Sequence, residues 1–215
     1  MDDDLLRGWI NTLGRSPDVE SCGRDLLDRW AEPHRRYHTT QHLREVLGAL
    51  DLVSAGADVP VAVRCAAYWH DAVYEPTAPD NEQRSAALAG AALSRLRLAP
   101  QVICDVTRLI LLTTSHAPAP DDLPGALLCD ADLAVLAATA ERYNAYAAGV
   151  RAEYAHLHDE AFRRGRVAVL AALLDRPQLF NTIEGHRRWE LAARDNLHAE
   201  LDRLSGPSAD AAPRP

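Results

Sequence analysis

Apolar residues recur along this chain at intervals of three and four positions rather than two, which is the period of an α-helix. The clearest stretch is 60–74, where a broad apolar face is formed by residues spaced by four, Val61, Cys65, Trp69 and Val73. Alanine and leucine dominate the chain, and strand-favouring runs are scarce. The pattern predicts an all-α fold, a compact bundle of helices.

The helix before this stretch is expected to begin at an N-cap, Thr39 or Thr40, and to end near Gly56. Because the connection to the helix over 60–74 is short, the two are expected to form an antiparallel pair. The same period predicts further helices over 3–14, 18–31, 81–97, 99–114, 126–137, 139–174 with one break, and 186–204.

The length of 215 residues suits one well-buried core, so residues 1–204 are expected to form a single domain. The tail 205–215 is rich in Pro, Ala, Ser and Gly and is expected to be disordered. No run approaches the roughly eighteen uninterrupted apolar residues of a membrane helix, so no membrane partner is expected. The acidic N-terminus lacks the features of a secretory signal, which favours the cytoplasm.

Charge narrows the range of functions. The net charge is -8, which disfavours the wide basic surface that duplex nucleic acid requires. All 23 basic residues are arginine, and the absence of lysine excludes Schiff-base catalysis and a lysine-containing phosphate loop. The four cysteines lie far apart without a Cys-x-x-Cys pair, which predicts neither a thiolate zinc site nor a disulfide framework. A small substrate fits this composition best.

Several imidazoles and carboxylates occur in apolar surroundings. His70 and Asp71 close the most apolar helix, where an unpaired charge costs several kcal/mol and a divalent cation compensates for it. Antiparallel pairing brings His42, near the start of the preceding helix, close to His70. Asp130 and Asp132 lie in a run of apolar residues, so at least one of them faces inward. Such a mixed set of nitrogen and oxygen donors suits Mn²⁺, Fe²⁺, Co²⁺, Ni²⁺ or Zn²⁺.

The order His, His-Asp, Asp on successive helices resembles the HD-domain superfamily of metal-dependent phosphohydrolases, from about Arg36 to Leu201. Strings around these residues strengthen the resemblance to one bacterial subfamily of predicted HD phosphohydrolases. They are Tyr37-His38-Thr39, His70-Asp71-Ala72-Val73-Tyr74, Asp80-Asn81-Glu82, Asp130-Ala131-Asp132-Leu133, Arg151-Ala152-Glu153-Tyr154, and Glu190 with Arg194 and Asn196.

The resemblance implies one divalent metal ion, Mn, Co, Ni, Fe, Zn or Mg, held by His42, His70, Asp71 and Asp132. Asp132 is favoured over Asp130 as the last ligand because the family's aspartate follows an alanine and precedes a leucine or arginine. Asp130 then becomes a supporting or helix-capping carboxylate. A single ion is expected because two-metal sites of the family usually add two further histidines after the His-Asp pair, and His116 alone lies between Asp71 and Asp132.

The resemblance also implies candidates for catalysis. Glu75 follows Asp71 by four residues and resembles the acidic residue after the His-Asp pair in several HD hydrolases, so we expect it to act as general acid or base beside Asp71. Asp80 is a weaker candidate for that role or for a supporting one, because Asp80-Asn81-Glu82 also has the pattern of a helix N-cap.

Candidates for substrate contact surround the ligands in the sequence. His116 opens a proline-rich loop and is expected to contact the substrate phosphate, and His38 is expected to support the site. Arg151, Arg194 and Tyr37 lie in strings that match the subfamily, although Arg194 also has the spacing of a helix ion pair with Glu190.

The expected activity is hydrolysis of a phosphate ester of a small molecule, with nucleotides among the candidates. Two alternatives stay open. One is a di-iron HD-domain oxygenase, which the shortage of histidines disfavours. The other is a non-catalytic module that binds metal or nucleotide. The sequence is compatible with a homodimer and does not determine the oligomeric state.

Overall fold

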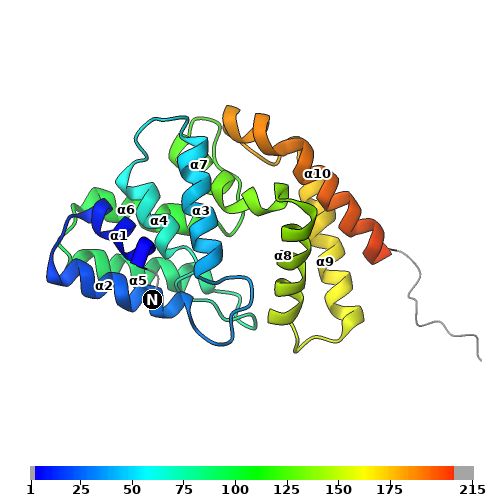
Figure 1. Cartoon of the computed structure of the whole chain (residues 1–215), viewed down its shortest axis with the longest axis horizontal. Helices are drawn as coiled ribbons and strands as arrows, with labels where there is room; N and C mark the ends of the chain where they lie inside the picture. The colour runs from blue at the N-terminus through cyan, green and yellow to red at the C-terminus, as the bar shows by residue number, and fades with distance from the viewer. Residues whose placement is uncertain (1–2, 206–215) are drawn as a thin grey trace, which may run out of the picture.

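A computed structural model describes residues 3–205, and this part of the chain holds helices and no strand (Figure 1). The all-α prediction is confirmed. The predicted disordered tail lies, apart from Ser205, outside the described residues. The helices are α1 (Asp3–Leu13), α2 (Pro17–Trp30), α3 (Thr40–Val53), α4 (Val61–Trp69), α5 (Asn81–Arg95), α6 (Pro100–Leu112), α7 (Leu123–Leu133), the 3-10 helix η1 (Ala134–Ala137), α8 (Ala140–Glu153), α9 (Asp159–Leu174) and α10 (Ile183–Ser205).

Local capping explains where several helices begin. Thr39 is the N-cap of α3, and its side chain accepts a hydrogen bond from the Gln41 backbone N–H. The side chain of Asp122 accepts from the Gly125 N–H, so α7 begins at Leu123, three residues before the predicted start. Pro124 is tolerated there because the first turn of a helix has no internal partner for its N–H groups.

Helix α4 is shorter than predicted, and its early end determines where His70 and Asp71 lie. It ends at Trp69, and His70 is its C-cap, whereas the apolar pattern predicts a helix to residue 74. The chain leaves the helix because the backbone N–H and carbonyl of Val73 pair with the Ser85 hydroxyl of α5 (3.0 and 3.3 Å) instead of continuing the helical ladder. His70 and Asp71 therefore lie at a turn, where both side chains can point to one place.

The core has two clusters of buried side chains. The first is built by α1 to α7, and its largest fully buried members include Trp9, Trp30 and Tyr68. The second lies between η1, α8, α9 and α10 and is built around Tyr143 and Phe180. Trp189 of α10 packs against both clusters, so they meet at that helix.

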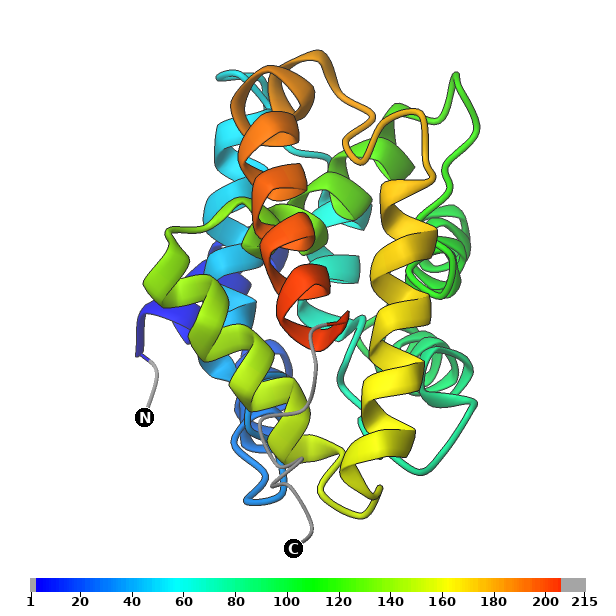
Figure 2. The same cartoon turned by 90° about the vertical axis from the view of Figure 1, so that its right-hand side faces the viewer.

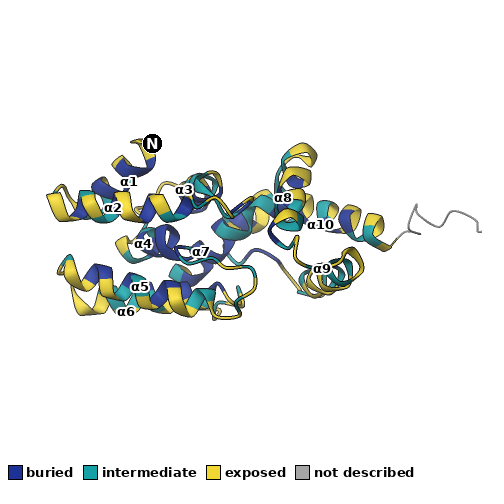
Figure 3. Ribbon diagram, turned by 90° about the horizontal axis from the view of Figure 1, so that it is seen from below, coloured by how far each residue is buried: buried dark blue, intermediate teal, exposed yellow. Residues whose placement is uncertain are grey.

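Helices α4 and α7 are the most deeply covered elements (Figure 3). They lie between a layer that contains α1, α2 and α3 and a layer that contains α5 and α6 (Figure 3). The last three helices, α8, α9 and α10, stand beside this layered part and face the viewer in Figure 2. A pocket opens where the two parts meet, next to the ends of α4 and α7.

No single helix within residues 3–205 has both the length and the apolar character needed to cross a membrane. One bent pair of segments, Leu123–Ala137 with Ala140–Glu153, reaches that length and composition together, with an angle of 105° between its parts.

Candidate metal centre

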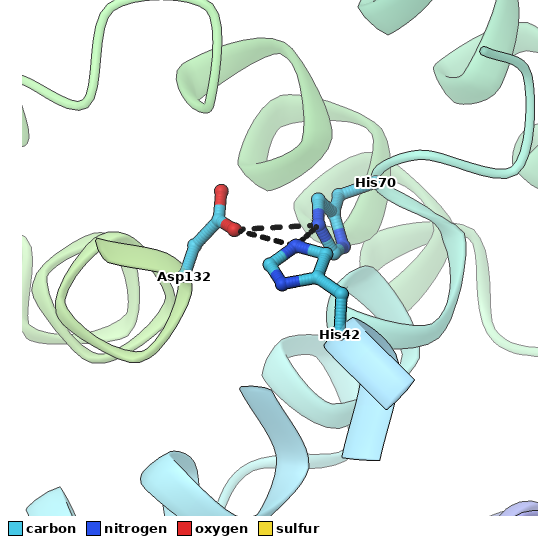
Figure 4. Close-up of side chains that lie close together, drawn as sticks. All are labelled: His42, His70 and Asp132. Carbon is cyan, nitrogen blue, oxygen red and sulfur yellow. Dashed lines mark hydrogen bonds and ion pairs between the residues drawn. The ribbon is translucent and has the colours of Figure 1, made fainter. Parts of the chain in front are cut away.

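Three side chains from different helices converge in the buried middle of the molecule (Figure 4). His42 comes from the first turn of α3, His70 from the C-cap of α4, and Asp132 from the last turn of α7. The Nε2 atoms of His42 and His70 are 3.3 Å apart, and Asp132 Oδ1 lies 3.1 and 3.5 Å from them. One ligand atom of each residue lies within 4.8 Å of the others, so the group can hold a metal ion.

The fourth predicted ligand lies at the edge of this group. Asp71 Oδ2 is 3.2 Å from His70 Nε2 and 3.8 Å from His42 Nε2. It is also 3.9 Å from Nε2 of His38, on the pocket side. The structure therefore brings all four predicted ligands together, with Asp71 between the buried imidazoles and the pocket.

Neighbouring groups hold the two imidazoles in orientations that suit a metal. His70 Nδ1 lies 2.8 Å from the Ala67 carbonyl oxygen, which can only accept, so Nδ1 carries the proton and Nε2 can keep a free lone pair. His42 Nδ1 lies 3.0 Å from the Tyr37 hydroxyl, which can fix the ring of His42 in the same way. Both Nε2 atoms then face each other, an arrangement that needs a shared proton or a cation.

The electrostatics of the group also favour a cation. Burial lowers the pKa of His42, and the hydrogen bond and charge of Asp132 offset this lowering only in part. Burial lowers the pKa of His70 too, but Asp71 and Asp132 outweigh it and raise that pKa well above its usual value. Both aspartates remain ionised despite burial, because the neighbouring histidines hold their pKa values below the usual range. Two buried carboxylates thus attract positive charge to one point.

The donor set fits a divalent transition-metal ion. Two imidazole nitrogens with carboxylate oxygens suit Mn²⁺, Fe²⁺, Co²⁺, Ni²⁺ or Zn²⁺. An ion bound about 2.1 Å from two nitrogens holds them roughly 3.0–3.4 Å apart, and the Nε2 atoms of His42 and His70 are 3.3 Å apart. Comparison with protein-family models, curated proteins and solved structures found no match to this chain.

Replacing Tyr37 by phenylalanine tests the orientation of His42. Tyr37 is buried and lines the pocket, and its hydroxyl contacts Nδ1 of the imidazole, so its role in the structure includes more than the predicted substrate contact. Tyr37→Phe is expected to weaken metal affinity roughly 10- to 100-fold, the usual effect of losing such a partner. Isothermal titration with Mn²⁺ or Zn²⁺ measures it, and unchanged affinity would contradict the assignment.

The site opens into a pocket of about 620 Å³. Asp71 and Asp132 line it, as do His38 and His116, whereas His42 and His70 lie behind them and are buried. A molecule in this pocket can reach the carboxylate side of the metal group but is kept from the imidazole side.

His116 is anchored to the ligand Asp132. Its Nε2 lies 2.8 Å from Asp132 Oδ2, and a carboxylate oxygen only accepts, so the imidazole donates. Its backbone has a φ of 47°, in the left-handed region, which is uncommon for a residue with a side chain. Arg176 holds this strained turn by donating to the carbonyl oxygens of Ser115 and His116 (2.8 and 3.1 Å). His116 therefore lines the pocket and contacts Asp132 of the candidate metal group directly, while its predicted contact with substrate phosphate stays a prediction.

His38 is held at the pocket by a buried carboxylate. Its Nδ1 donates to Glu153 Oε2 at 2.8 Å, and its ring stacks on Tyr74 at 3.9 Å between centroids. Glu153 Oε1 accepts from three consecutive backbone N–H groups, those of Arg36, Tyr37 and His38, at 2.8 to 3.0 Å. Glu153, which holds His38 at the pocket, was not among the site residues that the sequence predicted. It lies in the Arg-Ala-Glu-Tyr string, from which the sequence predicted only Arg151 as a site residue.

Two predicted catalytic carboxylates lie away from the site. Glu75 is exposed, and its Oε1 accepts a hydrogen bond from the Thr77 hydroxyl at 3.0 Å. Asp80 occupies the N-cap position of α5 without a side-chain capping bond, and it lies 3.9 Å from Arg84. Neither is among the residues that line the pocket in the described chain.

The two arginines predicted to bind substrate have structural partners. Arg151 donates to two backbone carbonyl oxygens and to Asp159. Arg194 pairs with Glu190 at 2.7 Å, the ion pair that its spacing indicates, and donates to carbonyl oxygens before α10. Neither Arg151 nor Arg194 is among the described residues that line the pocket.

Asp130 holds the chain before α10, including its cap Thr182, whose hydroxyl accepts from the Gly185 N–H, and it is not a member of the metal group. Oδ1 accepts from the Asn181 backbone N–H, and Oδ2 accepts from the backbone N–H and hydroxyl of Thr182, each at 2.7 Å. Burial raises the pKa of Asp130 although these donors oppose the shift. The contacts fix the start of α10 at Ile183, three residues before the predicted start.

Truncating Asp130 separates capping from metal binding. Asp130→Ala leaves two buried backbone N–H groups without their acceptor and is expected to cost about 3 kcal/mol or more of stability. Metal affinity is expected to change less than threefold. Urea unfolding and metal titration of the folded variant measure the two effects, and loss of metal with unchanged stability would exchange the roles of Asp130 and Asp132.

Proposed function

We propose that this chain is a metal-dependent phosphohydrolase of the HD-domain type, which acts in the cytoplasm on a phosphate monoester of a small molecule. One divalent ion would be held by His42, His70, Asp71 and Asp132. The observation that carries the proposal is the convergence of these donors at the inner end of a pocket large enough for a small ester. A bound divalent ion draws charge from a phosphoryl oxygen and lowers the pKa of water.

The hydrolysis breaks the bond between phosphorus and the ester oxygen and forms a bond between phosphorus and a water oxygen. One proton passes from the water to the leaving alcohol, and the products are the alcohol and inorganic phosphate. The reaction needs no oxidant or reductant, so besides the metal ion the protein needs groups that orient the ester and transfer one proton.

The residues of the pocket suit these tasks. His116 lines the pocket beside Asp132, and in its protonated form, with Nε2 donating to Asp132, it can donate from Nδ1 to a phosphoryl oxygen. His38 has Nδ1 committed to Glu153, so its Nε2 is the atom able to give a proton to the leaving oxygen. Asp71 borders the pocket, and the carboxylate oxygen that does not bind the ion can accept a proton from water. We assign proton transfer to this pair in preference to Glu75, because the Glu75 carboxylate is exposed and turned to Thr77.

Phosphate release tests the proposal. The metal-free chain is supplied in turn with Mn²⁺, Co²⁺, Ni²⁺, Mg²⁺ or Zn²⁺ and with a panel of phosphate monoesters. Asp71→Ala is expected to lose at least roughly 100-fold in kcat/KM, because even the partners of metal ligands are commonly worth 10- to 100-fold. Asp80→Ala removes an exposed carboxylate outside the pocket and is the matched control. Equal turnover by Asp71→Ala and the parent chain would overturn the proposal.

A further inference from the structure

The pocket has two unlike ends. One end is polar and is lined by Asp71 and Asp132, with His38 and His116 beside them. The walls formed by η1, α8, α9 and the turn between them are mainly apolar or aromatic and include Val135, Leu136, Val150, Leu157, Phe162 and Val169. An apolar wall of this kind stabilises a ligand by removing its hydrocarbon surface from water.

These walls offer no free positive charge. The chain has no lysine, and Arg166 is the one arginine that lines the pocket in the described part of the chain. Its guanidinium group is bound by both carboxylate oxygens of Glu200, at 2.8 and 2.9 Å, and donates to the Tyr146 hydroxyl at 3.1 Å. The Arg166–Glu200 pair is buried, so the charge of Arg166 is balanced within the protein.

Negative charge dominates the rest of the lining. Asp71, Asp132 and Glu82 all border the pocket. A divalent ion at the polar end offsets two of these charges and attracts one phosphoryl group. A second or third phosphate would meet the apolar wall or the Glu82 carboxylate and would find no free cation there.

From these features we infer the substrate class: a phosphate monoester with an apolar organic part, an alkyl or aryl phosphate, rather than a diphosphate or a nucleoside polyphosphate. The inference rests on the proposed function, and the reaction is the same hydrolysis. The phosphoryl group lies at the metal end, and the organic part lies along the wall that contains Val150, Leu157, Phe162 and Val169.

A series of unbranched alkyl phosphates tests the inference with a nearly constant leaving group. From ethyl to hexyl phosphate, kcat/KM of the metal-loaded chain is expected to rise roughly two- to fourfold for each added methylene. Propyl phosphate is expected to exceed glycerol 1-phosphate, and hexyl phosphate to exceed hexyl diphosphate and ATP at least tenfold. A flat alkyl series, or preference for the diphosphate or ATP, would overturn the inference.

A wall variant adds a second readout. Val169 lines the apolar wall, is half-exposed, and lies outside the metal centre, so its replacement is expected to fold. Val169→Arg supplies the missing cation and is expected to raise the ratio of kcat/KM for hexyl diphosphate to that for hexyl phosphate roughly tenfold. Val169→Met, similar in length without the charge, is expected to leave the ratio unchanged. An unchanged ratio in the folded arginine variant would contradict the charge argument.

Binding separates this inference from the proposed function. If no compound in the panel releases phosphate with any metal, the proposed hydrolysis fails. Alkylphosphonates, which lack the scissile ester bond, then probe the pocket of the metal-loaded chain by calorimetry. Tighter binding of hexylphosphonate than of ethylphosphonate would still support a site for one phosphoryl group beside an apolar wall. Equal binding of the two would overturn the inference.

Discussion

Replacement of His70 by alanine is expected to remove the bound divalent ion and, with it, phosphate release. His70 Nε2 lies within 3.5 Å of Asp132 Oδ1, Asp71 Oδ2 and His42 Nε2, so it contacts every other member of the proposed ligand set. Without it, two buried carboxylates are left with one neutral imidazole. Metal affinity is expected to fall at least about 1,000-fold, and element analysis after dialysis should change from about one ion per chain to none.

His198 provides the matched control for this experiment, because it is exposed on α10 and its loss removes one histidine without touching the site. His198→Ala is expected to keep metal and activity. His70→Gln, which retains bulk and polarity, distinguishes loss of a ligand from loss of fold, with circular dichroism as the check. Full metal content in folded His70→Gln would contradict the proposed centre. About two iron atoms per parent chain, with an oxygen-dependent optical change, would favour the oxygenase alternative.

The helices were predictable because periodicity and capping are local properties. Thr39 before α3 can be identified within one turn of chain, and its capping bond is present in the structure. Thr182 caps α10 locally, because its hydroxyl accepts from the Gly185 N–H at 2.9 Å, but the start of α10 was missed because Thr182 itself is held by Asp130, 52 residues earlier. The end of α4 was missed for the same reason, since Ser85 from the next helix takes the hydrogen bonds of Val73.

The apolar setting of His70, Asp71 and the Asp130–Asp132 pair predicted a compensated group there, because buried charge needs a partner, whereas the choice of Asp132 over Asp130 came from the resemblance. His42, His70, Asp71 and Asp132 lie together in the structure. Their chemistry stays a proposal, since geometry alone does not identify a reaction. Glu153 carried no such signal, because an acidic residue in a polar stretch of helix resembles a solvated one until the chain from Arg36 to His38 packs on it.

In the loop after Asp71, spacing along the sequence does not determine the direction of the Glu75 side chain. Glu75 is only four residues from a ligand, yet Asn81 accepts from the Glu75 backbone N–H and donates to its carbonyl oxygen, both at 2.9 Å. These bonds set the turn, and the Glu75 side chain bonds to Thr77 at the surface. Side-chain direction in a loop depends on such bonds, which the distance along the chain does not encode.

Truncation of Glu153 is expected to produce the largest loss of stability outside the core. Glu153→Ala leaves the backbone N–H groups of Arg36, Tyr37 and His38 without their shared acceptor and frees the imidazole of His38 and the hydroxyl of Tyr74. The free energy of unfolding is expected to fall by roughly 3–5 kcal/mol, as for other broken buried networks. Phosphate release is expected to fall as well, because His38 loses its orientation. Urea unfolding and initial rates measure the two effects.

The pH dependence of stability distinguishes the charge of Glu153 from its shape. Burial alone would raise the pKa of this carboxyl group, but His38 and the backbone N–H groups lower it from its usual 4.5 to about 2. Because the folded pKa is the lower one, the ionised form stabilises the fold fully above pH 4.5, and this contribution is lost as pH falls towards 2. The full contribution is about 3 kcal/mol, of which about 2 kcal/mol is lost by pH 3.

Glu153→Gln keeps one acceptor oxygen and the side-chain volume but has no charge to titrate. At neutral pH it is expected to be less stable than the parent chain, and the difference between the two should shrink by about 2 kcal/mol between pH 7 and pH 3. Comparing the two proteins cancels the titration of the other carboxylates, since these are shared. A difference that stays constant over this range would mean that Glu153 acts through packing and hydrogen-bond geometry alone, and that His38 is held by shape rather than by charge.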